Sequence, residues 1–108
     1  MRIGDNMAKK FIKNFRKNKR INHPTYLVDR DGNVYKYIGI THSETTLGKK
    51  NIPLKSNPNP EDNKTAYVRP WVEKDKAENF GRRLKGWRFL KEDKKTIKGI
   101  VDKDKNKK

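Results

Sequence analysis

Two histidines, His23 and His42, are the only imidazole side chains in this chain of 108 residues. Residues 25–40 are rich in β-branched and aromatic side chains, and the Asp31-Gly32 pair within them predicts a hairpin turn. His23 would enter the first strand of that hairpin and His42 would leave the second. Because those two ends are neighbours in an antiparallel pair, we expect both rings at one end of a sheet.

A pair of imidazoles beside a cation is a workable set for cleaving RNA without a metal ion. One imidazole would take the proton of the 2′-hydroxyl, the other would protonate the leaving oxygen, and the cation would stabilise the transition state. We expect His42 to be the general acid or base and His23 its partner, with the two roles unassigned. The rest of the predicted catalytic set consists of polar neighbours and cations, Thr41, Ser43, Lys49 and Arg69.

A simpler interpretation of both histidines is open at this point. His23 would then be a turn residue before Pro24, and His42 a polar residue of a loop.

The charge of the chain indicates a polyanionic partner. Lys and Arg number 29 against 13 Asp and Glu, a formal net charge of +16. We expect nucleic acid, RNA in preference to DNA, to be that partner. The predicted contacts are mostly cations of an N-terminal helix, joined by one loop lysine and one strand tyrosine: Lys9, Lys10, Lys13, Arg16, Lys17, Arg20, Lys50 and Tyr67. The alternatives are a solvated basic helix face and a tyrosine that belongs to the core.

Several classes of protein are disfavoured by what the sequence lacks. Without cysteine there is no disulfide, thiol nucleophile or cysteine-bound zinc. No apolar run approaches the roughly 20 residues of a membrane span, and the first residues lack a hydrophobic signal core. We therefore predict no metal, no cofactor and no membrane partner, and a cytoplasmic location.

The predicted fold is α+β, with one domain over residues 1–101. A small antiparallel sheet of about four strands would carry an N-terminal and a C-terminal helix. Met7, Phe11 and Phe15, spaced four apart, predict the first helix, a basic amphipathic one over residues 7–21. The second would run from Glu92 to about Lys103.

Two further segments are predicted to be irregular. Residues 41–64 contain two Asn-Pro pairs and predict a long functional loop. Residues 102–108 are almost all charged and predict a disordered tail.

A set of motifs between about His23 and Val101 resembles a group of small basic proteins encoded on bacterial phages and conjugative elements. That group is linked to the phage-borne members of the barnase–EndoU–colicin–RelE (BECR) nuclease superfamily. The motifs are Ile38-Gly39-Ile40-Thr41-His42-Ser43, Gly48-Lys49-Lys50-Asn51-Ile52-Pro53-Leu54, Asn57-Pro58-Asn59-Pro60, Tyr67-Val68-Arg69-Pro70, Asn79-Phe80-Gly81 and Leu84-Lys85-Gly86-Trp87.

The resemblance implies metal-independent RNA cleavage on an α+β fold, in which an N-terminal helical part packs on an antiparallel sheet. It also implies that the cytoplasm is that of a bacterial or phage-infected cell, and a protein partner of the immunity or antitoxin kind is left open. The residues it carries over are Thr41, His42, Ser43, Lys49, Lys50 and Arg69. Two other functions stay open, a non-catalytic DNA- or RNA-binding module of a phage or mobile element and a basic inhibitor of a host protein.

Overall fold

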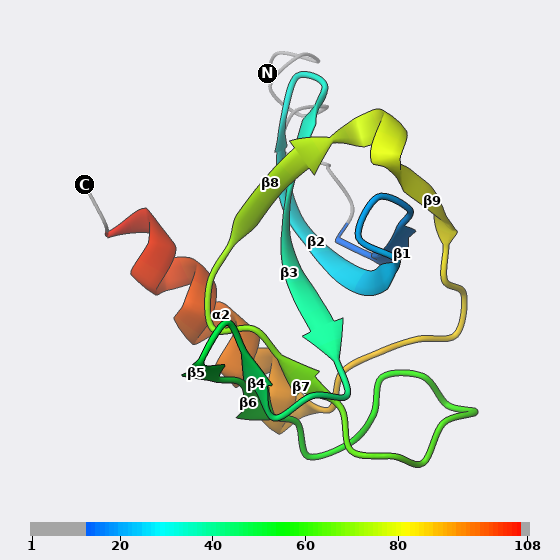
Figure 1. The fold of residues 1–108 in the computed structure, drawn as a ribbon, viewed down its shortest axis with the longest axis vertical. Coiled ribbons are helices and arrows are strands. Elements are labelled where there is room, and N and C mark those ends of the chain that lie inside the picture. The colour runs from blue at the N-terminus through cyan, green and yellow to red at the C-terminus, as the bar shows by residue number, and fades with distance from the viewer. Residues whose placement is uncertain (1–12, 107–108) are drawn as a thin grey trace, which may run out of the picture.

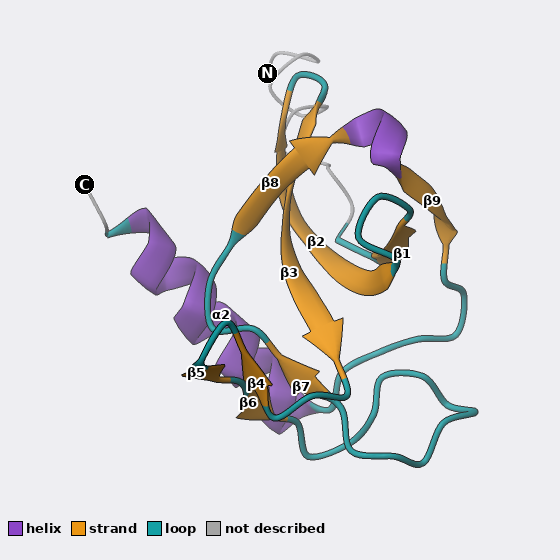
Figure 2. Ribbon diagram, in the orientation of Figure 1, coloured by secondary structure: helices purple, strands orange, loops and turns teal. Residues whose placement is uncertain are grey.

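The structure is a computed structural model that describes residues 13–106. Within that range it is an α+β fold with an antiparallel sheet of seven strands, a separate pair of short strands, and one α-helix (Figure 1; Figure 2). The elements are β1 (Phe15–Asn18), β2 (His23–Asp31), β3 (Val34–Thr41), β4 (Thr45–Thr46), β5 (Lys49–Lys50), β6 (Ile52–Pro53), β7 (Tyr67–Val68), β8 (Glu73–Lys76), β9 (Phe80–Arg83) and α2 (Lys91–Lys105).

The α+β class is confirmed, but the expected sheet of about four strands was too small. Three of the additional strands, β4, β5 and β6, have two residues each and lie within residues 41–64, which were predicted to be a loop. Ladders this short leave no alternating pattern in the sequence, which is why they were not recognised.

Strand β3 organises the sheet because it is paired along both edges. On one edge β2 forms the predicted hairpin, with Thr25 opposite Gly39. On the other edge β8 pairs with residues 34–37 and β7 with residues 40–41. Between those two partners, Arg69 donates its backbone N–H to the carbonyl of Gly39 at 3.0 Å. The backbone of β3 therefore fixes the positions of three other strands.

The sheet curls until its two outer strands become neighbours in the chain. The pairing path runs β8–β3–β2–β1–β9, and one 3-10 turn, Ala77–Asn79, joins β8 to β9 (Figure 1). Phe80 of β9 contacts Tyr35 and Tyr37 of β3, with ring centroids 5.2 and 5.4 Å apart. Because β1 and β2 separate these strands in the sheet, the contact runs across the inside of the curl.

The two faces of the sheet hold separate hydrophobic clusters. Successive strand residues point to opposite faces, so the neighbours Tyr37 and Ile38 are both fully buried but belong to different clusters. Tyr37 lies inside the curl with Phe80, whereas Ile38 lies on the face covered by α2, which contributes Ile97 and Ile100. Burying each large apolar side chain contributes about 1.5–3 kcal/mol. The predicted C-terminal helix is thus confirmed, packed on the sheet.

The N-terminal helix predicted over residues 7–21 is wrong for the part that can be compared. Residues 7–12 lie outside the described residues, and residues 13–21 contain β1 and a turn. β1 is paired on both sides, with β2 and with β9, and Phe15 lies opposite Tyr26. The four-residue spacing that ends at Phe15 indicated one helical face, but pairing with two strands satisfies the same backbone in an extended form.

Asparagine side chains build the turn that follows β1. Asn18 is fully buried, and its Oδ1 accepts the backbone N–H groups of Arg20 at 2.9 Å and Ile21 at 3.2 Å. Asn22 adopts a positive φ of 58°, a conformation that asparagine tolerates better than most residues. These asparagines are a sequence signal for a turn, but the four-residue spacing of Met7, Phe11 and Phe15 led to the prediction of a helix instead.

Helix α2 also extends beyond its predicted end. It continues to Lys105, so residues 102–105 are helical rather than part of a disordered tail, while residues 107–108 lie outside the described range. Lys98 Nζ is 2.8 Å from Asp102 Oδ2, an i,i+4 ion pair that supports the added turn. Val101 packs on the larger hydrophobic cluster and holds the same turn to the sheet.

A carboxylate closes the curl from inside. Asp75 of β8 accepts hydrogen bonds from the side chains of Asn18 at 2.9 Å, Arg20 at 2.7 Å and Asn79 at 2.7 Å, and from the backbone N–H of Lys76 at 2.8 Å. Its side chain is only 9% exposed. Burial alone would raise the pKa of Asp75, but these hydrogen bonds outweigh it and hold the pKa well below its usual range.

Replacing Asp75 should therefore destabilise the protein in a pH-dependent way. In Asp75→Ala the amide of the buried Asn18 loses its acceptor, and we expect the free energy of unfolding at pH 7 to fall by about 2–4 kcal/mol. A carboxyl with a depressed pKa stabilises the fold above its unfolded pKa of about 3.9 and loses that effect as the pH falls further. Urea unfolding at pH 7 and pH 3 should show the deficit shrinking in acid.

The matched control is Glu78→Ala, which removes an exposed acid from the adjoining 3-10 turn. Its unfolding free energy should stay within about 0.5 kcal/mol of the wild-type value. A deficit for Asp75→Ala that is equal at both pH values would contradict the assigned role of its charge.

Candidate active site

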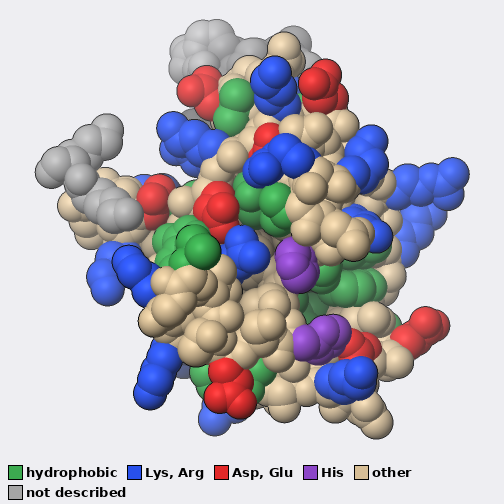
Figure 3. All heavy atoms as spheres, in the orientation of Figure 1, with side chains coloured by type: hydrophobic (Ala, Val, Ile, Leu, Met, Phe, Trp, Pro, Cys, Tyr) green, Lys and Arg blue, Asp and Glu red, His purple; other side chains and the backbone are tan. Residues whose placement is uncertain are grey.

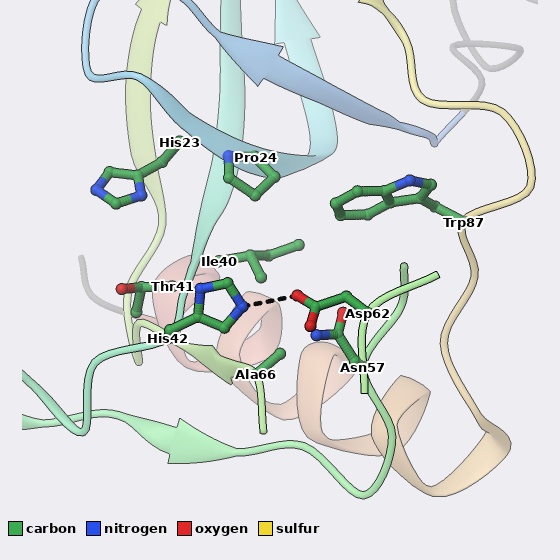
Figure 4. A pocket seen from close by; sticks show the side chains of 9 residues that line it. All are labelled: His23, Pro24, Ile40, Thr41, His42, Asn57, Asp62, Ala66 and Trp87. Carbon is green, nitrogen blue, oxygen red and sulfur yellow. Dashed lines mark hydrogen bonds and ion pairs between the residues drawn. The ribbon is translucent and has the colours of Figure 1, made fainter. Parts of the chain in front are cut away.

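A cavity lies at the end of the hairpin where β2 begins and β3 ends. The register that pairs Thr25 with Gly39 brings His23 and Thr41 to this end. The cavity encloses about 50 Å³ and is lined by His23, Pro24, Ile40, Thr41, His42, Asn57, Asp62, Ala66 and Trp87 (Figure 4). Both histidines lie close together on one face of the molecule (Figure 3). The structure thus has the juxtaposition that the hairpin predicts, while the catalytic role of the two rings stays a prediction.

His42 is held by a carboxylate that the sequence did not single out. Its Nε2 lies 2.8 Å from Oδ2 of Asp62. The pKa of Asp62 is lowered, first by the hydrogen bond from the backbone N–H of Lys64 and next by that from His42, so Asp62 is an ionised acceptor at neutral pH. Nε2 of His42 must therefore be the donor, which leaves Nδ1 as the ring nitrogen that can serve a ligand.

Asx turns fix the loop that carries Asp62. Oδ1 of Asn57 accepts the backbone N–H of Asn59 at 2.9 Å, Oδ1 of Asn59 accepts that of Glu61 at 3.0 Å, and Oδ1 of Asp62 accepts that of Lys64 at 3.0 Å. Each side chain thus replaces a backbone partner that an irregular segment lacks. The Asn-Pro pairs were recognised as loop chemistry, and this repeat of Asx residues is the signal that could have pointed to Asp62.

The start of the same loop is tied to the C-terminal helix. Asp93 of α2, 2% exposed, accepts the backbone N–H groups of Lys55 at 2.9 Å and Ser56 at 3.2 Å. Both carboxylate oxygens are used, one for each donor. The buried carboxylate of Asp93 therefore anchors the loop to α2.

His23 is suited to the neutral form at pH 7. It is half-buried, and its pKa is lowered first by that burial and then by the positive charges of Arg69 and His42. An imidazole with a pKa below 6.5 is mostly unprotonated near neutrality and can accept a proton. The two rings therefore have different surroundings, one beside a cation and the other beside a carboxylate.

Arg69 is not among the described residues that line the cavity, but its charge acts on His23. Its Nη1 is 3.2 Å from Oε2 of Glu73. Gly39 makes room for it, because a Cβ there would lie 3.1 Å from Cδ of Arg69. Its Nε is buried and has no hydrogen-bond partner among residues 13–106. The charge of Arg69 lowers the pKa of His23 after the effect of burial, while its role as a direct phosphate ligand stays a prediction.

The other predicted site residues are divided by the structure. Thr41 lines the cavity and accepts the backbone N–H of Ser43 on its Oγ1 at 3.1 Å, while Ser43 itself does not line it. Lys49 and Lys50 are exposed on the β4–β5 hairpin, outside the described lining, and Tyr67 is half-buried on β7. Of the predicted catalytic set, His23, Thr41 and His42 come together.

The cations expected on one helical face are also separated. Lys9 and Lys10 lie outside the described residues. Arg16 bonds to the carbonyl of Gly81 through Nη1 at 2.9 Å, and Arg20 bonds to Asp75, so both are used in holding the sheet together. Lys13 and Lys17 are exposed. The prediction of a single basic helix face is therefore wrong for these residues, because they lie on a strand and a turn.

Comparison of the chain with family models, with curated proteins and with solved structures finds no match. Among residues 13–106, no helix is both long and apolar enough to cross a membrane. Over the same residues, no three His, Asp or Glu side chains gather as ligands for a metal ion.

The electrostatics of His23 can be tested by an NMR titration of the two imidazoles. We expect His23 to titrate below 6.5 and its pKa to rise in Arg69→Gln, because the variant removes the second-largest cause of the lowering and leaves the burial. Lys74→Gln, which removes an exposed cation on β8, should leave the pKa of His23 where it is. A wild-type His23 that titrates at or above 6.5 would contradict the assignment.

Proposed function

We propose that the protein is a metal-independent endoribonuclease in which His23 and His42 are the acid–base pair. The observation that supports it best is two imidazoles in one small cavity, one of them held by the ionised carboxylate of Asp62 at 2.8 Å. The proposal agrees with the BECR-type resemblance of the surrounding motifs. The net charge of +16 adds support, because it favours encounter with RNA.

The two surroundings suggest which ring has which role. His23, with its lowered pKa, is the base that removes the 2′-hydroxyl proton. The 2′-oxygen then attacks phosphorus, the bond from phosphorus to the 5′-oxygen breaks, and protonated His42 gives its proton to that leaving oxygen. The products carry a 2′,3′-cyclic phosphate and a 5′-hydroxyl. Asp62 orients the imidazole of His42 through the hydrogen bond that it accepts from Nε2.

A non-catalytic RNA-binding module is the second candidate. The observation in its favour is that no Lys or Arg is among the described residues that line the cavity. A nuclease of this kind needs positive charge near the phosphate, so the source of that charge separates the two candidates.

Cleavage of an RNA oligonucleotide in the presence of EDTA tests the enzyme directly. We expect cleavage to persist in EDTA and to slow by about 10²–10⁴-fold in His23→Ala and in His42→Ala, which is the usual contribution of a positioned acid or base. Lys74→Ala, far from the cavity lining, should cleave at the wild-type rate. Unchanged cleavage in His42→Ala would rule out its assigned role, and binding without cleavage by the wild type would favour the module.

Asp62 should affect the rate more than substrate binding. In Asp62→Asn the amide can no longer fix the ring of His42 as an ionised carboxylate does, and we expect kcat to fall about 10²-fold while KM stays within a few-fold. Asp62→Glu keeps the carboxylate and should retain more activity than the amide variant. A change confined to KM would instead indicate that Asp62 contributes to substrate binding.

A further inference from the structure

A second hollow adjoins the catalytic cavity, and Trp87 is the one described residue that lines both. This basic groove encloses about 170 Å³. Four cations line it, Lys13, Arg83, Arg88 and Lys94, together with the aromatic rings of Tyr26 and Trp87, and no described lining residue is an acid. In Figure 4 the indole of Trp87 stands across the catalytic cavity from His23. The charge that the catalytic cavity lacks is therefore present beyond Trp87.

The four cations come from separate parts of the chain. Lys13 precedes β1, Arg83 ends β9, Arg88 lies between β9 and α2, and Lys94 is in the first turns of α2. All four are exposed, and none forms an ion pair with a residue in the range 13–106. Cations gathered around one hollow without a neutralising acid repel one another, and a bound polyanion would relieve that repulsion.

The floor of the groove is a packed aromatic cluster. Phe15 lies 5.8 Å from Trp87 and 4.8 Å from Phe89, and Tyr26 lies 4.8 Å from Phe89, measured between ring centroids. Burial raises the pKa of the Tyr26 hydroxyl, as expected for a ring seated in this floor. Trp87 remains only half-buried, so part of its indole is available to a ligand.

Gly86 allows the chain to bring Trp87 to this place. Its φ of +81° is in the region that glycine adopts readily and other residues rarely adopt. At this place Trp87 lines both hollows. Aromatic surfaces beside cations are the means by which proteins hold unpaired bases and their phosphates.

We propose that the basic groove binds single-stranded RNA next to the cleaved phosphate, with one base stacked on Trp87 and the adjoining phosphates on the four cations. The placement of the cleaved bond at the histidines rests on the proposed function. A single strand is favoured over a duplex because only an unpaired base has a free face for the indole, whereas paired bases are stacked inside their helix.

Binding of an RNA whose 2′-oxygens are methylated tests the groove without cleavage. We expect Arg88→Gln/Lys94→Gln to weaken binding about tenfold or more at moderate salt. The slope of log K against log salt should also become shallower by about 1.4, because each single-strand phosphate contact contributes about 0.7. Lys74→Gln/Lys76→Gln removes the same charge from exposed positions on β8 and should leave the slope unchanged. Equal losses of RNA affinity in the two double variants would rule out the basic groove as the binding site.

Tryptophan fluorescence gives an independent measure, because the chain has two tryptophans. Quenching by the methylated RNA should be lost in Trp87→Phe and kept in Trp71→Phe. Tighter binding of a duplex of the same sequence than of the single strand would also overturn the proposal.

The two proposals fail in different ways. If the groove variants lose binding while His23→Ala and His42→Ala still cleave, the groove stands as a binding site and the catalytic assignment is wrong. If the histidine variants are inactive while the groove variants bind and quench like the wild type, the catalytic assignment stands and the groove is overturned.

Discussion

The structure depends on the pairing of β3 along both of its edges. The hairpin with β2 occupies one edge, and the other is shared by β8, by the backbone of Arg69 and by β7. β7 and β8 pair with neighbouring stretches of the same edge of β3, so the four residues that connect them pass beside Gly39. This connection brings Arg69 against β3. The same pairing ends at Thr41, where the chain leaves the sheet with His42. The pairing of β3 therefore determines where the cavity lies.

The elements that could be predicted from the sequence were those with a local sequence pattern. The Asp31-Gly32 turn predicted the hairpin and, with it, the meeting of His23 and His42, and the C-terminal helix was also predicted from the sequence. The segment over residues 13–21 was missed because its placement depends on two partners distant in sequence, β2 and β9. Asp62 was missed for the same reason. This loop carboxylate is paired with a histidine 20 residues away, and no local spacing records such a neighbour.

The charge of the chain is arranged separately from the chemistry of the cavity. The described residues that line the cavity include two imidazoles and one carboxylate but no Lys or Arg. Part of the positive charge serves the fold, as in Arg16 and Arg20, and another part surrounds the basic groove. Arg69, which does not line the cavity, lowers the pKa of His23 through its charge, after the larger effect of burial.

The tie between Asp93 and the loop has a consequence for how the protein is made. Asp93 follows the histidines and Asp62 in the sequence, so the ribosome produces the hairpin and the loop before the helix that anchors them. A nascent chain that already contains His23, His42 and Asp62 still lacks the acceptor for two backbone N–H groups of that loop. The loop that carries Asp62 is therefore anchored last, by a helix that follows it in the sequence.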